Sequence, residues 1–135
     1  MKISLFLSKY EPQVYAILRI MTGFLFLWHG SQKLFGVPPF AYPMSAFIIF
    51  TGIIEFMGGL LIMIGLLTRW AAFICSGQMA IAYWSVHGLH AILPIVNKGE
   101  LAVLYCFLFL FIFIKGSGIF SLDYLLVIIK QKHKN

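Results

Sequence analysis

A small set of ionisable side chains lies within or at the ends of long apolar stretches of the sequence. The set comprises Arg19, His29, Lys33, Glu55, His87 and Glu100. A charged side chain at the centre of a bilayer costs about 2.5–3.5 kcal/mol even on lenient scales, and a buried charge without a partner costs more. Ionisable residues in such surroundings are therefore candidates for function. The alternative is a structural ion pair that only fixes the register of two helices.

A quinone, or another small amphipathic carbonyl compound, fits the chemistry of these groups. Its oxygens would accept hydrogen bonds from a cation or an imidazole, and a carboxylate would exchange protons with it. We expect His29, Lys33 and Glu100 to line such a site, with His87 as a further ligand-binding candidate. A metal site would need His90 as well, but the H-x-x-H spacing of His87 and His90 carries little specificity, so no metal is expected.

The spacing of the polar residues predicts the helix faces that carry them, because an α-helix turns about 100° per residue. From Arg19 onward, one face carries Thr22, Gly23, Phe26, His29, Gly30 and Lys33. Glu55 shares a face with Gly52, Gly58 and Gly59, and small residues let membrane helices approach closely. We therefore expect these two faces to meet and to bury Arg19 and Glu55 as a charged core, either as a pair or in a network with His29.

The composition indicates that these helices lie in a membrane. Of the 135 residues, 61% are hydrophobic and 10% are charged, whereas soluble domains are about half apolar and about a quarter charged. Too few polar residues remain to cover a surface that faces water. The length allows one domain and no separate soluble catalytic module. The net charge of +6 is spread over segment ends, which argues against nucleic acid as a partner.

Four segments are apolar enough to cross a bilayer, which takes about 20 residues in a helix. They are residues 14–35, 45–67, 70–86 and 100–114. The tail, residues 119–130, is apolar and then basic, and it is too short for a fifth span, so we expect an interfacial helix there. The predicted fold is all-α: a transmembrane four-helix bundle with short loops, forming a single domain over residues 1–135.

The distribution of basic residues predicts the orientation of this bundle. Four spans place both termini on one side, which would hold Lys2, Lys9, Arg69, Lys115, Lys130, Lys132 and Lys134. The other side would hold only Lys33 and Lys98. Because loops on the cytoplasmic side carry the excess of Lys and Arg, we expect both termini in the cytoplasm and the chain in a bacterial inner membrane.

Short motifs that follow one another along the chain resemble a known family. They are "LR" at 18–19, "HGSQKLFG" at 29–36, "EFMGGLLIMIGLLTRWAA" at 55–72, "MAIAY" at 79–83, "KGELAVL" at 98–104 and "GSGIFSLD" at 116–123. In their order and spacing they resemble the DoxX-like membrane proteins, which are small four-helix bundles. Ser117 stands where the family often has a proline.

The resemblance implies a redox-linked membrane role with quinone nearby. The family takes its name from a subunit associated with archaeal quinol oxidase and thiosulfate:quinone oxidoreductase complexes, and relatives are discussed as membrane partners of redox and thiol-stress enzymes. Carried over by position, the family's polar pattern falls on Arg19, His29, Lys33, Glu55, Arg69, His87 and Glu100.

The leading hypothesis is therefore an inner-membrane, redox-associated subunit, a quinone-linked oxidoreductase component. One alternative is a small proton-coupled transporter that works as a dimer with Glu55 as its titrating group. The other is a non-catalytic scaffold whose charges only hold its helices together. Candidate partners are the lipid bilayer, a redox partner subunit and a second copy of the chain.

Overall fold

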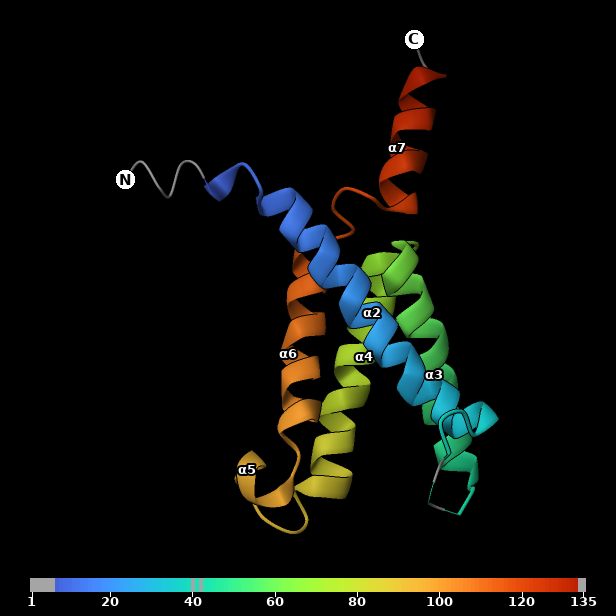
Figure 1. Ribbon diagram of the computed structural model, residues 1–135, viewed down its shortest axis with the longest axis vertical. Helices are drawn as coiled ribbons and strands as arrows, with labels where there is room; N and C mark the ends of the chain where they lie inside the picture. Colours follow the sequence, from blue (N-terminus) through green and yellow to red (C-terminus); the bar gives the residue numbers. More distant parts are fainter. Residues whose placement is uncertain (1–6, 40, 42, 134–135) are drawn as a thin grey trace.

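The computed structural model describes residues 7–39, 41 and 43–133 (Figure 1). Within these residues every regular element is a helix, so the prediction of an all-α fold is confirmed. The helices are α2 (Glu11–Phe35), α3 (Ala46–Ile64), α4 (Thr68–Ala82), the π-helix η1 (Tyr83–His87), α5 (Pro94–Asn97), α6 (Glu100–Lys115) and α7 (Leu122–Lys132). Lys2 and Lys134, which we expect on the cytoplasmic side, lie outside the described residues.

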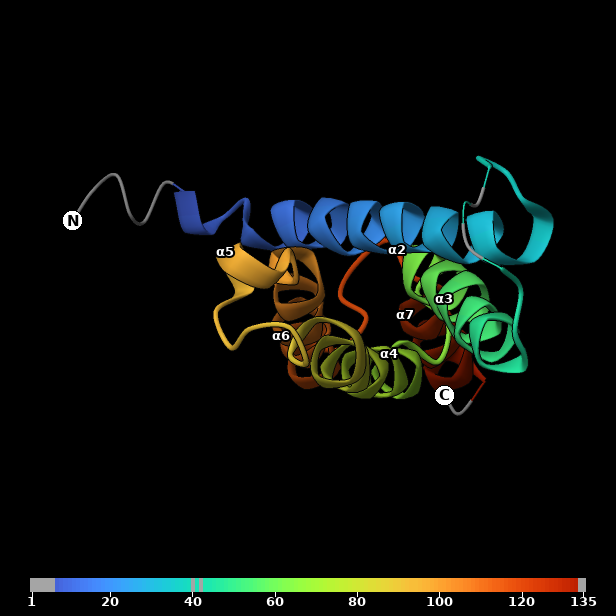
Figure 2. The ribbon, with the colours of Figure 1, turned by 90° about the horizontal axis from the view of Figure 1, so that it is seen from below.

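The long helices pack in a chain of neighbours. α2 lies along α3, α3 contacts α4, and α4 packs along α6. Seen from below, α2 runs along one side, and α3, α4 and α6 lie on the other (Figure 2). The start of α2 and all of α7 lie toward one end of the molecule, and α5 lies at the other (Figure 1). α7 buries none of its described side chains.

Glycines and caps set the helix ends. Ser45 caps the start of α3 by accepting a hydrogen bond from the Ile48 N–H, as a serine at this position does in many helices. Gly65 ends α3 with a φ of 72°, a left-handed conformation that glycine adopts without steric cost. α3 is therefore shorter than the predicted segment 45–67. α4 gives way to the π-helix at Tyr83 and so ends before the predicted residue 86.

α2 and α3 approach so closely that side chains are excluded between them. A Cβ atom added at Gly30 would lie 2.2 Å from the backbone nitrogen of Phe56, and one added at Gly23 would lie 2.5 Å from the carbonyl oxygen of Gly59. No real side chain fits at such distances. The glycines on the predicted polar face are therefore what lets the two backbones meet.

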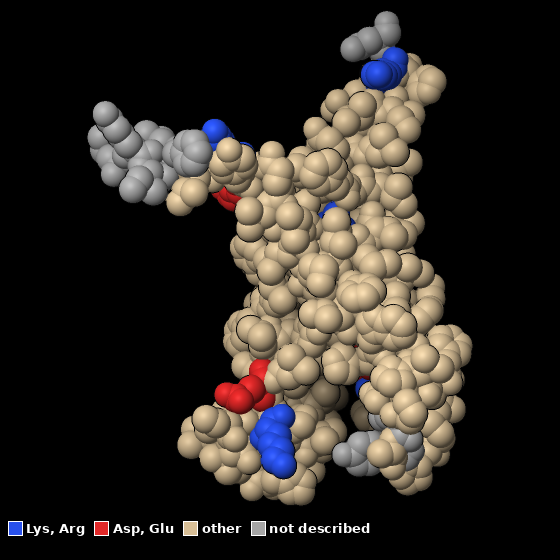
Figure 3. Space-filling view, viewed as in Figure 1, with Lys and Arg blue, Asp and Glu red and all other residues tan. Residues whose placement is uncertain are grey.

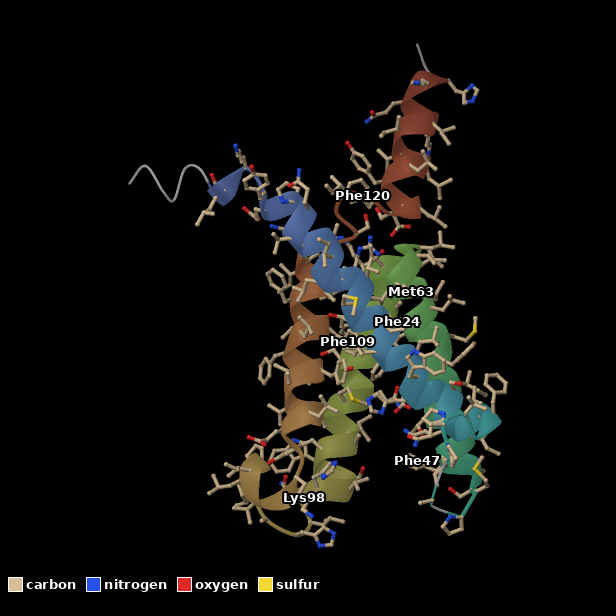
Figure 4. The ribbon with its side chains drawn as sticks, in the orientation of Figure 1. Phe24, Phe47, Met63, Lys98, Phe109 and Phe120 are labelled. Carbon is tan, nitrogen blue, oxygen red and sulfur yellow. The ribbon has the colours of Figure 1, made fainter. Side chains whose placement is uncertain are left out.

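An apolar core lies on the inner side of this packing. Phe26, Ile62, Cys75, Phe109 and Ile112 each expose at most 1% of their surface. The ring centroids of Phe26 on α2 and Phe109 on α6 are 4.7 Å apart, so the two helices meet in this core. Figure 4 labels Phe109.

The outer surface of the helices is also apolar. Large exposed side chains include Leu25 and Trp28 on α2, Phe50 on α3, Phe73 on α4 and Phe107 on α6. On the face shown in Figure 3, charged residues gather toward the two ends and leave the middle almost free of charge. Two of the described helices, α2 and α3, are long and apolar enough to cross a membrane. Hydrocarbon suits such a surface better than water does.

Candidate functional site

Lys33, Glu55, Gln78 and Thr51 form a polar cluster where α2, α3 and α4 come together. Lys33 Nζ lies 2.6 Å from Glu55 Oε1 and forms an ion pair with it. Gln78 Nε2 donates hydrogen bonds to the same carboxylate oxygen, at 2.9 Å, and to the carbonyl oxygen of Thr51, at 3.2 Å. The side chain of Glu55 is 3% exposed and that of Lys33 is 22% exposed. A buried carboxylate is thus held by one cation and one amide.

Two glycines of α3 make room for this cluster. A Cβ atom at Gly52 would lie 2.9 Å from the Cβ of Lys33, so glycine lets the lysine cross the helix interface to Glu55. A Cβ atom at Gly58 would lie 2.3 Å from the Sγ of Cys75. Glycine at this position therefore lets α4, which carries Gln78, lie close to α3.

Two acceptor atoms of the cluster have no hydrogen-bond partner. They are Glu55 Oε2 and Gln78 Oε1, and both are buried. The orientation of the Gln78 amide follows from its neighbours, because the groups on its other side, the Thr51 carbonyl and Glu55 Oε1, are acceptors and need the NH₂ group. A buried polar atom without a partner costs about 1–3 kcal/mol. The cluster therefore carries two unsatisfied acceptor atoms beside its ion pair.

A large cavity borders the cluster between α3 and α4. Its volume is 1030 Å³, and its lining includes Lys33, Thr51, Glu55 and Gln78 among mostly apolar side chains. Phe47, Phe50, Phe73 and Ile81 also line it, and each exposes more than half of its surface. Figure 4 labels Phe47 at the start of α3. The cavity thus opens sideways, through the apolar surface of the molecule.

A second, smaller cavity of 340 Å³ reaches the same ion pair from the α2–α6 side. Lys33, Glu55 and His87 line both cavities. His29, Lys98 and Tyr105 line only the smaller one. The Lys33–Glu55 pair therefore stands between the two spaces.

Arg19 is fully buried, but its partners differ from those expected. Its Nη1 donates to the carbonyl oxygens of Ile62, at 2.6 Å, and Met63, at 2.8 Å, while its Nη2 donates to Phe120, at 2.7 Å. Figure 4 places Met63 and Phe120 at the end of the bundle from which α7 extends. The expectation of an Arg19–Glu55 pair is therefore wrong. Ile62 lies two helical turns, about 10 Å, beyond Glu55. The guanidinium group of Arg19 therefore cannot bind the Ile62 carbonyl and the Glu55 carboxylate at the same time.

The other predicted residues lie around the smaller cavity or on the surface. His29 is half-buried, and its ring centroid is 6.1 Å from that of Tyr105. His87 Nδ1 lies 3.0 Å from the carbonyl oxygen of Asn97. Glu100 is exposed and lines neither cavity, so the structure does not bring it to His29 and Lys33. His90 is exposed as well. The described residues contain no group of three or more His, Cys, Asp or Glu side chains that could hold a metal ion.

Three polar residues were not predicted from the sequence: Thr51 and Gln78 of the cluster, and Asp123. Gln78 is an isolated amide in an apolar segment, and that isolation was the available signal. Asp123 accepts hydrogen bonds from the Leu67 N–H and from the N–H and hydroxyl of Thr68, each at 2.9 Å. It thereby ties the start of α7 to the α3–α4 turn. Arg69 is exposed and donates to the carbonyl oxygens of Phe113 and Ile114 at the end of α6.

Comparisons with known proteins assign the chain to a family. The family model described as DoxX matches residues 14–88. An uncharacterized protein of Haemophilus influenzae (strain Rd) is 39% identical over 128 residues, which cover 87% of this chain and 93% of that protein. No solved structure matches the chain. The matched segment contains α3, α4, η1 and all of α2 except its first three residues, and hence the ion pair and Gln78. The chain belongs to the DoxX family.

Proposed function

We propose that this membrane protein is a four-span, quinone-linked subunit that binds a quinol in the larger cavity. The proposal rests above all on one observation. Glu55, whose Oε2 is buried and without a hydrogen-bond partner, is one of the few polar residues that line the 1030 Å³ cavity. A ligand for this place must bring a hydrogen-bond donor and must be mostly apolar.

A quinol meets both requirements. Its flat ring and tail match the apolar walls, and its hydroxyl groups can donate to Glu55 Oε2 and Gln78 Oε1. In the oxidised form, the carbonyl oxygens would instead need donors, and the cluster has fewer of these: both N–H groups of Gln78 point to Thr51 and Glu55, and Lys33 keeps one N–H beyond those directed to Glu55 and Thr51. The lateral opening suits a ligand that arrives from the bilayer. The resemblance to DoxX-like proteins supports a redox-linked role, in which a partner redox subunit of the membrane would exchange electrons with the bound ligand.

The proposed spans are α2, α3, α4 with η1, and α6. α4 and η1 together cover residues 68–87, a length of about 30 Å, which equals the hydrocarbon thickness of a typical bilayer. α6 has 16 residues and is shorter, about 24 Å. In this arrangement α7 serves as the interfacial helix, because its apolar residues are exposed and Lys130 and Lys132 lie in its last turn.

The proposed location is the inner membrane, with both termini in the cytoplasm. Lys9, Arg69, Lys115 and Lys130 belong to the segments at the end from which α7 extends. Lys98 lies beside α5 at the opposite end (Figure 4). This distribution agrees with an excess of positive charge on the cytoplasmic side.

A binding measurement tests this proposal. Purified protein in lipid nanodiscs is titrated with decylubiquinol and with decylubiquinone, and we expect the quinol to bind more tightly. Glu55→Gln replaces an acceptor oxygen with an NH₂ donor, so we expect quinol affinity to fall about tenfold, equivalent to about 1.4 kcal/mol. The preference for quinol should then disappear or reverse.

The matched control is Glu100→Gln, the same change at an exposed glutamate that lines neither cavity. We expect this variant to bind like the unmodified chain. Equal quinol affinity for the two variants would show that the Glu55 carboxylate does not bind the ligand.

A further inference from the structure

The smaller cavity differs from the larger one in the chemistry of its walls. Besides Glu55, Lys33 and His87, which line both cavities, it is lined by His29, Lys98 and Tyr105. Imidazole, ammonium and phenol groups hold water and carry protons, unlike the phenylalanines and isoleucines of the larger cavity. Chains of Glu and His side chains are typical of proton paths in membrane proteins.

This cavity leads to the α5 end of the molecule. Lys98 is exposed and lies beside α5 (Figure 4). The surface in Figure 3 is hollowed at the same end, between the part built on α5 and the part that carries the start of α3. Of the wall residues, Lys98 lies just before α6 and Ala102 lies in its first turn. The smaller cavity thus extends from Glu55 toward this end.

From Glu55 toward the end of the molecule that holds Arg19, the interior is closed to water. In this direction the interior is filled by Cys75, Phe109 and, at the level of Arg19, Ile62, each with 0% of its surface exposed. They belong to one continuous apolar core. Closely packed apolar side chains leave no room for a chain of water molecules.

We propose that the smaller cavity is a one-sided, water-filled route by which Glu55 exchanges protons with the aqueous phase at the α5 end. This proposal rests on the proposed function for the source of the proton. A hydroxyl group of the ligand in the larger cavity would donate that proton to Glu55 Oε2. In that step the ligand O–H bond breaks and a carboxyl O–H bond forms. The carboxyl group then releases the proton to water in the route.

His87 and His29 are the relay groups between Glu55 and the surface. The Asn97 carbonyl can only accept, so His87 Nδ1 carries the proton of their 3.0 Å hydrogen bond, and the neutral ring keeps Nε2 as an acceptor. The ionisable groups that surround Glu55 are Lys33 and His29 from α2, Cys75 from α4 and His87 from η1.

Cysteine labelling tests the route without any quinone. In a Cys106→Ser background, Ala102→Cys places a thiol on the wall of the smaller cavity. Ala71→Cys is the matched control, because Ala71 is an equally buried helical alanine that lines neither cavity. Glu100→Cys marks the α5 side, since Glu100 is exposed there. Each variant in sealed vesicles is treated from one side at a time with the membrane-impermeant methanethiosulfonate ethylsulfonate.

We expect Ala102→Cys to react from the same side as Glu100→Cys, and at least about tenfold faster than Ala71→Cys, because only accessible thiols react. Labelling of Ala102→Cys no faster than Ala71→Cys, or labelling from the opposite side, would overturn the route. If labelling succeeds and quinol fails to bind, the proposed ligand is wrong and the route stands.

An infrared measurement adds a readout of the proton itself. At a pH low enough to protonate Glu55, the carboxyl C=O band that is absent in Glu55→Gln belongs to Glu55, and the shift of that band on hydrogen–deuterium exchange reports access to water. We expect the sulfonate group attached at Ala102→Cys to slow this exchange at least about tenfold, as exchange depends on opening to solvent. Unchanged exchange in the labelled protein would contradict the route.

Discussion

Replacing Arg19 by alanine is expected to destabilise the folded protein by about 3–5 kcal/mol, because it leaves several carbonyl oxygens without a donor and each buried one costs about 1–3 kcal/mol. Arg19 is fully buried, and the substitution leaves the carbonyl oxygens of Ile62, Met63 and Phe120 without their donor. Ile62 and Met63 lie in the last turn of α3, where carbonyl groups have no partner within the helix and a positive charge is favourable. Losing these hydrogen bonds therefore weakens the attachment of both the end of α3 and the segment that leads into α7.

Unfolding in detergent, followed by circular dichroism, measures this effect. Arg69→Ala is the matched control, because Arg69 also donates to two carbonyl oxygens at a helix end but is exposed. Water replaces its hydrogen bonds, so we expect a loss of about 1 kcal/mol. Arg19→Lys should fall between the two, since one ammonium group lacks the forked geometry of the guanidinium. A loss of stability in Arg19→Ala no larger than in Arg69→Ala would contradict a stabilising role for the buried hydrogen bonds of Arg19.

Breaking the Lys33–Glu55 pair is expected to cost about 3 kcal/mol for either single substitution, because the remaining member stays in an apolar interior. Lys33→Met leaves Glu55 Oε1 with Gln78 alone, and Glu55→Gln leaves the ammonium of Lys33 without a counter-charge. The double variant removes both charges and keeps similar side-chain volumes. We therefore expect it to be more stable than the sum of the single losses indicates.

A double-mutant cycle by the same unfolding method isolates the interaction. We expect a coupling energy of about 1–3 kcal/mol between the two positions, as for other directly paired residues. Lys33→Met combined with Glu100→Gln is the control, because Glu100 is exposed and does not line the cavities around Lys33. The stability losses of Lys33→Met and Glu100→Gln should add, with no coupling energy between them. Additive losses at positions 33 and 55 would mean that the pair contributes nothing to the fold.

Helical periodicity was sufficient to identify the buried face of α2. Arg19, Thr22, Gly23, Phe26 and Gly30 are all buried, because a face follows from residue spacing alone. Pairing across helices does not follow from spacing. It depends on how far one helix is shifted along the other, and here the contacts at Gly23 and Gly30 set that shift.

This shift explains the wrong pairing. It brings the last turn of α2 to the level of Glu55, so Lys33 rather than Arg19 neutralises the carboxylate. Arg19 instead reaches the end of α3. The sequence carried no sign of the role of Asp123 at the α3–α4 turn either, because that role depends on where the chain returns after α6.

The position of a bound quinone is the most direct test of the proposed site. Protein in nanodiscs is illuminated with a photoreactive azidoquinol, digested, and analysed by mass spectrometry, with and without excess decylubiquinol. We predict labelling at Phe50, Gly77 or Ile81, which line the larger cavity, and protection by the competitor. Labelling confined to lipid-facing residues such as Trp28 and Phe107, unaffected by the competitor, would contradict a quinol site at Glu55.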